Sequence, residues 1–209
     1  MYMVIPAYRV VADFEDGLAK YARSDFAVAV DSCTAAIFLC LEYFKANSIY
    51  GRKYAENIIT IPKRTFPSIP MEILHAGYKL QFEDLDWKGI YQLKPLPIYD
   101  GAKRFHEGMY MYNSFHCLSF HYKKHLPIGR GGAILTNNGD AARWFRQARF
   151  FGRNEGVPLS KDQFAMCGWN LYMDPPRAAR GLTLLSMMKD SNPDLLEDYS
   201  DLSKQKIFN

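Results

Sequence analysis

Continuous or alternating apolar runs alternate with helically spaced apolar residues along most of this chain. Strands are expected at 26–30, 57–61, 78–82, 96–102, 115–120 and 133–136. Helices are expected at 13–23, 35–43, 70–76, 140–151 and 178–188. In the helix at 140–151, arginines 143, 146 and 149 fall on or near one face, which predicts a solvated basic surface.

Composition places the chain in the globular class. It has 209 residues, of which 48% are apolar and 15% aromatic, so a sizeable core is expected. The net charge is +4, but acidic and basic residues are interspersed, which argues against a nucleic-acid-binding arm. No apolar run approaches the ~18 residues of a membrane span and the N-terminus does not resemble a signal peptide, so we expect a cytoplasmic protein.

The cysteines and histidines do not indicate a metal site. Neither His106 nor His116 has the paired spacing of metal ligands. The four cysteines lack a C-x-x-C pairing and mostly lie in apolar runs, which favours buried thiols in a reducing compartment over disulfides or zinc. They are Cys33, Cys40, Cys117 and Cys167.

The strongest candidate for chemistry is the end of the strand at 115–120. This strand leads into Lys123 and Lys124 and then into a glycine-rich turn at 129–132. Partial burial and neighbouring cations lower the pKa of a lysine and make its amine a nucleophile towards carbonyl groups. A pair of solvated loop lysines is the alternative that the residues alone leave open.

Two further positions lie where the elements of an α/β fold commonly bind ligands. The turn at 31–34 joins a strand to a helix, and free backbone N–H groups at such a turn suit a phosphate, although ordinary helix capping explains the residues equally well. Asp100 ends the strand at 96–102, at the edge where α/β sheets place their ligands, although Asp before Gly also favours a simple turn.

Several motifs together resemble one known family. They are S-C-T-A-A from Ser32, P-x-x-T-F from Pro62, S-F-H-x-x-K from Ser119 followed by G-G at 131–132, and G-x-N from Gly168. This set resembles the DegT/DnrJ/EryC1/StrS family of sugar aminotransferases that use pyridoxal 5'-phosphate (PLP). The resemblance implies the α/β fold of type I PLP enzymes, a three-layer α/β/α sandwich around a mixed, mostly parallel sheet.

The resemblance also implies roles for single residues. Lys124 corresponds to the Schiff-base lysine, Asp100 to the partner of the protonated pyridine nitrogen, and Phe66 to the aromatic residue that stacks on the cofactor ring. Lys103 stands where the family contacts the phenolic oxygen of the ring. The phosphate contacts correspond to Thr34, Ala35, Ser119 and, from the partner subunit of a homodimer with shared active sites, the position of Asn170.

The sequence departs from the family pattern at several points. Cys33 replaces a glycine, Lys103 a Gln or His, Arg130 an acidic residue, and Tyr172 an Arg or Lys. A β-α unit is missing or reduced to a loop between 86 and 97. We expect a reduced PLP-binding domain at 1–190 and a polar tail at 191–209, without the family's small C-terminal domain.

The implied activity is transfer of an amino group from an amino acid, with glutamate as the donor by analogy, to a keto-sugar nucleotide, as in polysaccharide biosynthesis. The alternative is a truncated PLP-binding or interaction protein without turnover, or one that needs a separate small domain in trans. A PLP-dependent sugar dehydratase is disfavoured, because those relatives carry histidine where this chain has Lys124.

Overall fold

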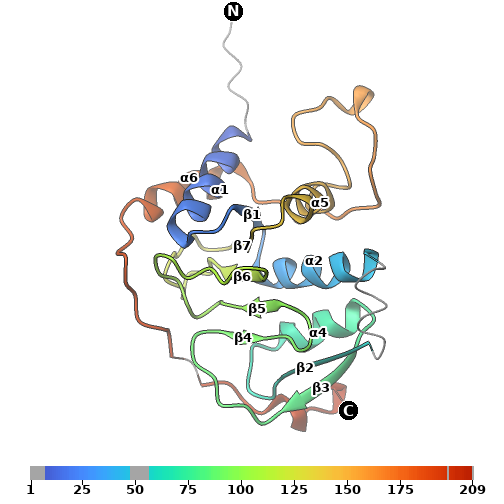
Figure 1. Ribbon diagram of the computed structural model, residues 1–209, viewed down its shortest axis with the longest axis vertical. Helices are drawn as coiled ribbons and strands as arrows, with labels where there is room; N and C mark the ends of the chain where they lie inside the picture. The colour runs from blue at the N-terminus through green and yellow to red at the C-terminus, as the bar shows by residue number, and fades with distance from the viewer. Residues whose placement is uncertain (1–7, 48–56, 197, 209) are drawn as a thin grey trace, which may run out of the picture.

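A mixed β-sheet forms the centre of the protein. The computed structural model describes residues 8–47, 57–196 and 198–208. Five strands lie in the spatial order β1, β7, β6, β5, β4 (Figure 1). Their bounds are Phe26–Val30 for β1, Gly132–Thr136 for β7, Phe115–Ser119 for β6, Ile98–Asp100 for β5 and Tyr91–Gln92 for β4.

A second pair of strands continues the sheet at its β4 edge. β2 (Ile58–Pro62) and β3 (Lys79–Glu83) pair in parallel. Thr60 and Lys94 exchange backbone hydrogen bonds of 2.8 and 3.0 Å, which attach β2 to the residues that follow β4. The strand pattern of the sequence is therefore recovered, and β4 is an addition to it.

The strand directions correct one expectation. A mostly parallel sheet is wrong for the described strands: β5–β6 and β2–β3 are parallel, whereas β1–β7, β6–β7 and β4–β5 are antiparallel. Only residues 93–97 separate β4 from β5, and so short a connection joins antiparallel neighbours, because a parallel pair needs a crossover of about a dozen residues or more. The shortened segment at 86–97 thus returns the chain as an antiparallel strand.

Helices cover both faces of the sheet, so the expected three-layer α/β/α architecture is confirmed (Figure 1). In β1, Ala27 and Ala29 face one core while Val28 and Val30 face the other, as the two-residue period of a strand requires. The first core is covered by α1 (Arg9–Ala22) and α6 (Pro175–Leu185). The second is covered by α2 (Cys33–Ala46), α4 (Ser68–His75) and α5 (Gly139–Arg149).

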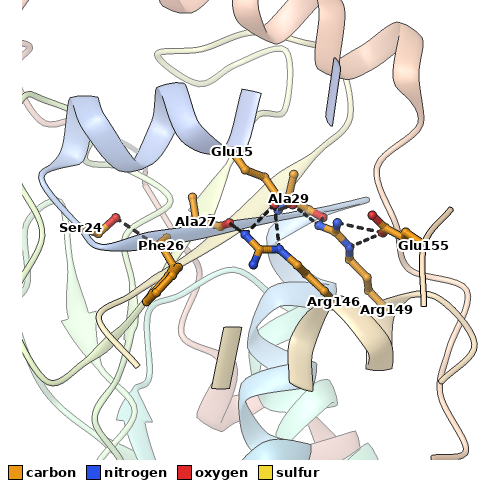
Figure 2. Close-up of polar contacts among 8 residues, drawn as sticks. All are labelled: Glu15, Ser24, Phe26, Ala27, Ala29, Arg146, Arg149 and Glu155. Carbon is orange, nitrogen blue, oxygen red and sulfur yellow. Dashed lines mark hydrogen bonds and ion pairs between the residues drawn. The ribbon is translucent and has the colours of Figure 1, made fainter. Parts of the chain in front are cut away.

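Helix α5 does not carry the solvated basic face that the arginine spacing predicts. The Arg149 side chain is only 1% exposed and binds the buried carboxylate of Glu15 and the carbonyl oxygen of Ala29 (Figure 2). Arg146 binds the same carboxylate at 3.0 Å, and Glu155 lies 2.9 Å from Arg149. The periodicity shows the face but not the buried acid on α1, so only Arg143 is a mainly exposed cation.

The stretch after α6 crosses the protein instead of leaving it. In Figure 1 it runs from α6 past the ends of the central strands to the edge formed by β3. Two short 3-10 turns, Leu202–Lys204 and Lys206–Phe208, lie near its end, and Leu202 is buried. A polar tail is expected at 191–209, and the described part of it lies beside the pocket described next.

Candidate active site

One cavity gathers most of the candidate residues. It has a volume of about 210 Å³ and lies at the carboxyl ends of β5 and β6, against the first turn of α2. Its lining includes Thr34, Phe66, Asp100, Ser119 and Lys124, which come from five separate segments of the chain. Residues that are far apart in the sequence are therefore close together in the fold.

The first turn of α2 forms one wall of the cavity. Ser32 is the N-cap, and its hydroxyl accepts the backbone N–H of Ala35 at 3.1 Å. The Thr34 hydroxyl lies 2.8 Å from the hydroxyl of Ser68. The amino end of a helix carries a partial positive charge, so this wall favours an anionic group such as a phosphate.

Cys33 fits the turn without strain. It is the first residue of α2, and its φ is not positive, so the turn does not need the glycine that the family pattern carries there. Its thiol lies 4.0 Å from the Asp100 carboxylate. Burial, followed by the charge of Asp100, raises the pKa of this thiol, which keeps it protonated.

Asp100 supplies a buried carboxylate at the base of the cavity. It is 4% exposed and accepts the backbone N–H of Ala102 at 3.0 Å. Burial raises its pKa, while the Ala102 N–H, the Tyr91 hydroxyl and the positive charges of Lys124 and Lys103 oppose that rise. Such a carboxylate is suited to pair with a buried cationic N–H group.

Lys124 lies in the turn that follows β6. Its backbone N–H donates to the carbonyl oxygen of His121 at 2.8 Å, which fixes the turn after Ser119. Both Lys123 and Lys124 line the cavity, but the charge of Lys124 is the one that bears on Asp100 and Cys33. Of the two lysines, Lys124 is therefore the one whose charge acts on this carboxylate.

The double glycine lets two walls of the cavity approach each other. A Cβ atom on Gly132 would lie 2.4 Å from the backbone carbon of Ser32, so no larger residue fits where β7 passes the N-cap of α2. On the rim, Arg130 binds Asp31 at 2.8 Å. The residue that departs from the family pattern here therefore pairs with an acid beside the helix N-terminus.

An aromatic cluster borders the cavity on its outer side. The Phe66 ring is 53% exposed and lies 6.5 Å from the ring of Tyr199. The amine of Lys103 lies 4.2 Å from the centre of the Tyr199 ring and 4.6 Å from that of Trp87. Lys103 does not line the cavity, although its charge acts on Asp100.

Three other sequence positions also lie outside the cavity lining. Ala35 is buried, and its N–H is taken by the Ser32 cap. Asn170 is exposed and pairs with Phe150 in an isolated β-bridge. Tyr172 packs against the ring of Phe150 at 5.2 Å. Asn170, which the resemblance assigns to the partner subunit's site, thus lies on the surface.

Tyr91, Trp87 and Tyr199 were missed by sequence reasoning. The Tyr91 hydroxyl lies 2.7 Å from that of Thr65 and also bonds to Asp100, yet Tyr91 lies in the shortened segment, where no family motif marks it. Tyr199 comes from the polar stretch near the C-terminus. The one signal for these residues in the sequence is their aromatic character.

Comparison with known proteins assigns the family. The model of the DegT/DnrJ/EryC1/StrS aminotransferase family matches residues 3–99 and 106–201. The chain belongs to this family. Over 76 residues it is 41% identical to the spore coat polysaccharide biosynthesis protein SpsC of Bacillus subtilis, a match that covers 36% of this chain and 18% of SpsC.

Solved structures of similar fold include sugar aminotransferases. One from Micromonospora echinospora matches with a TM-score of 0.67 at 17% identity, covering 85% of this chain and 60% of its own. PseC of Helicobacter pylori, an aminotransferase involved in the biosynthesis of pseudoaminic acid, matches with a TM-score of 0.66 at 16% identity, covering 88% and 63%. The chain thus spans less than two thirds of the length of these relatives.

Metal binding and membrane insertion are two further possibilities for residues 8–47, 57–196 and 198–208. No group of three or more His, Cys, Asp or Glu side chains there could hold a metal ion. No helix in these ranges has the length and apolar character needed to cross a bilayer.

Proposed function

We propose that this protein is a PLP-dependent aminotransferase that moves an amino group from an amino acid, glutamate, to a keto-sugar nucleotide. The observation that carries the proposal is the convergence of Lys124, Asp100, Ser119, Thr34 and Phe66 on one cavity. Bound PLP would supply an electron sink for reactions at the carbon that carries the amino group.

The cavity residues fit the parts of that cofactor. The hydroxyls of Thr34 and Ser119 and the amino end of α2 would hold its phosphate. The exposed ring of Phe66 would stack on its ring. Asp100 would hold a proton on the pyridine nitrogen, because a buried carboxylate stabilises an adjacent N–H cation.

Lys124 would act through its amine. The amine would be the nucleophile towards the carbonyl group of PLP. It would then carry a proton to and from the substrate carbon that bears the amino group. The positive charge of Lys124 and the carboxylate of Asp100 would stabilise each other, because the charge of Lys124 opposes the rise in the pKa of Asp100. Lys103, whose amine lies over the rings of Trp87 and Tyr199, would act on this pair through the effect of its positive charge on Asp100.

We further propose a cytoplasmic homodimer with shared sites. Asn170 of each subunit would reach the phosphate bound by the other, which is consistent with its exposed position outside its own cavity. The hydrophobic side chains exposed on the neighbouring loop favour such an interface. They are Phe151, Val157, Leu159 and Phe164.

The test is a visible absorption titration with PLP. Wild type and Lys123→Ala should develop the band of lysine-bound PLP, and Lys124→Ala should not. Lys123 is a matched control, since it is adjacent and lines the same cavity. The reverse result would move the reactive amine to Lys123.

A second function is a PLP-binding protein without turnover. This chain spans 60% and 63% of the length of two solved relatives, so turnover is tested separately from cofactor binding. The band described above with no conversion of any donor amino acid to its keto acid would favour this second function. Conversion of glutamate to 2-oxoglutarate, together with a loss of absorbance in that band, would favour the aminotransferase.

A further inference from the structure

Tyr91 lies opposite Asp100 in the sheet. The antiparallel pairing of β4 with β5 makes the two residues cross-strand partners, and the side chains of such a pair project from the same face and lie close together. Both side chains are buried, and the thiol of Cys33 lies 4.0 Å from the same carboxylate. Tyr91 does not line the cavity, so its hydroxyl can act on a ligand there only through Asp100.

The Tyr91 hydroxyl joins two buried side chains. It lies 2.7 Å from the hydroxyl of Thr65 and hydrogen-bonds the Asp100 carboxylate. An ionised carboxylate only accepts hydrogen bonds, so the single phenolic proton of Tyr91 is donated to Asp100. The Tyr91 oxygen then accepts a hydrogen bond from Thr65, and the three groups form a chain that ends on the carboxylate.

The residues around this chain hold both hydroxyl groups in place. The Tyr91 ring packs against the ring of Trp87, with the centroids 4.6 Å apart. Trp87 in turn donates its indole N–H at 2.8 Å to the carbonyl oxygen of Arg64, the residue before Thr65. The segment that carries Tyr91 is therefore fixed to the segment that carries Thr65.

The hydrogen bond from Tyr91 favours the charged form of Asp100. Burial raises the pKa of this carboxyl, while the N–H of Ala102, the Tyr91 hydroxyl and the charges of Lys124 and Lys103 oppose that rise. The Ala102 N–H donates to one carboxylate oxygen at 3.0 Å. Loss of the Tyr91 hydroxyl would leave burial opposed by one donor fewer.

We propose that Tyr91 is a positioning residue whose hydroxyl, supported by Thr65, fixes the Asp100 carboxylate and keeps it ionised, ready to hold a cationic ring N–H in the cavity. The assignment of that N–H to the pyridine nitrogen of PLP rests on the proposed function. The chain of hydroxyls rests on the contacts above. Tyr91 comes from the shortened segment at 86–97, so this support for Asp100 follows from the antiparallel return of the chain.

The first test follows the Asp100 carboxyl in the protein without PLP. Protein with isotope-labelled aspartate is titrated with pH by carbon NMR, and the Asp100 signal is the one missing from Asp100→Asn. Tyr91→Phe removes only the hydroxyl and should raise the pKa of Asp100, because burial is then opposed by one donor fewer. Thr65→Val keeps the shape of the side chain and should raise that pKa less, since Thr65 acts through Tyr91.

Tyr78→Phe is the matched control. Tyr78 is also a buried tyrosine, but its hydroxyl donates to the carbonyl oxygen of Leu41 at 3.2 Å, and neither residue lines the cavity. The control should lower the urea midpoint and leave the pKa of Asp100 unchanged. The same pattern in Tyr91→Phe would mean that Tyr91 only stabilises the fold, and it would overturn the inference.

The second readout is PLP affinity in the absorption titration. Tyr91→Phe should weaken binding by roughly tenfold, as expected for one lost hydrogen bond to a charged group. In an Asp100→Asn background the same substitution should have a clearly smaller effect, and equal losses in both backgrounds would contradict the inference. A wild type that does not bind PLP, with an Asp100 pKa that rises in Tyr91→Phe, would refute the proposed function and leave the positioning of the carboxylate in place.

Discussion

Removing the carboxylate of Glu15 should destabilise the protein strongly. This side chain is 3% exposed and accepts hydrogen bonds from Arg149, from Arg146 at 3.0 Å and from the Ala29 N–H at 2.9 Å (Figure 2). It joins α1 and β1 to α5. In Glu15→Ala, Arg149 stays buried with Glu155 as its remaining acidic partner among the described residues.

The expected cost follows from that geometry. Removing one partner of a buried ion pair costs about 3–5 kcal/mol, because the other charge stays buried without a partner that compensates it. A domain is typically stable by only about 5–15 kcal/mol. At roughly 2–4 °C per kcal/mol for a chain of this size, the melting temperature should fall by roughly 6–20 °C.

The assay is urea unfolding followed by far-ultraviolet circular dichroism, with Glu15→Ala, Arg149→Ala and the double variant forming a cycle. The two single losses should overlap, so the double variant loses clearly less than their sum. Asp13→Ala is the control, since Asp13 pairs with Arg9 on the exposed side of the same helix and should be nearly silent. A loss below about 1 kcal/mol in Glu15→Ala, or strict additivity, would refute the reasoning.

Three further predictions concern the sheet and the cavity. Burial lowers the pKa of His116 to about 4, so below pH 6.5 the unfolded state binds more protons than the folded state. Wild type should therefore lose about 3 kcal/mol of stability between pH 7 and pH 4, as measured by urea unfolding at each pH. His116→Leu should not show this loss. Burial raises the pKa of Asp100, so the contribution of this group to stability is lost as the pH rises through that pKa. Asp100→Asn should therefore unfold at a higher urea concentration than wild type at pH 8, yet bind PLP more weakly in a titration. A lower urea midpoint would contradict this. Gly132→Ala should cost about 1–3 kcal/mol by the same assay, because its Cβ meets the Ser32 backbone; an unchanged midpoint would show that the strand can shift.

Local pattern was sufficient to locate most strands and helices. The strand at 26–30 is predicted residue for residue, and its alternation assigns Ala27 and Val28 to opposite cores. The helix ends differ by a few residues: α1 begins at Arg9 rather than 13, in a segment whose apolar spacing is less regular. Strand direction was harder, because it depends on how the chain returns between strands and not on the strands themselves.

Long-range pairing explains what the sequence did not reveal. The partner of Arg149 lies 134 positions away, on a helix whose own pattern shows an ordinary amphipathic face. The position of Tyr199 depends on the path of a segment with little periodicity. By contrast, Lys124, Asp100 and Thr34 were recognisable because each follows a strand or starts a helix, where local pattern and family motif coincide.

The central claim is that the Lys124 amine reacts at a PLP site in this cavity. The most direct measurement is borohydride reduction of the protein with added PLP, followed by peptide mass analysis. The account predicts a reduced pyridoxyl adduct on Lys124 in the wild type, and none on Lys123. An adduct on Lys123, or one scattered over surface lysines with Lys124 unmodified, would contradict it.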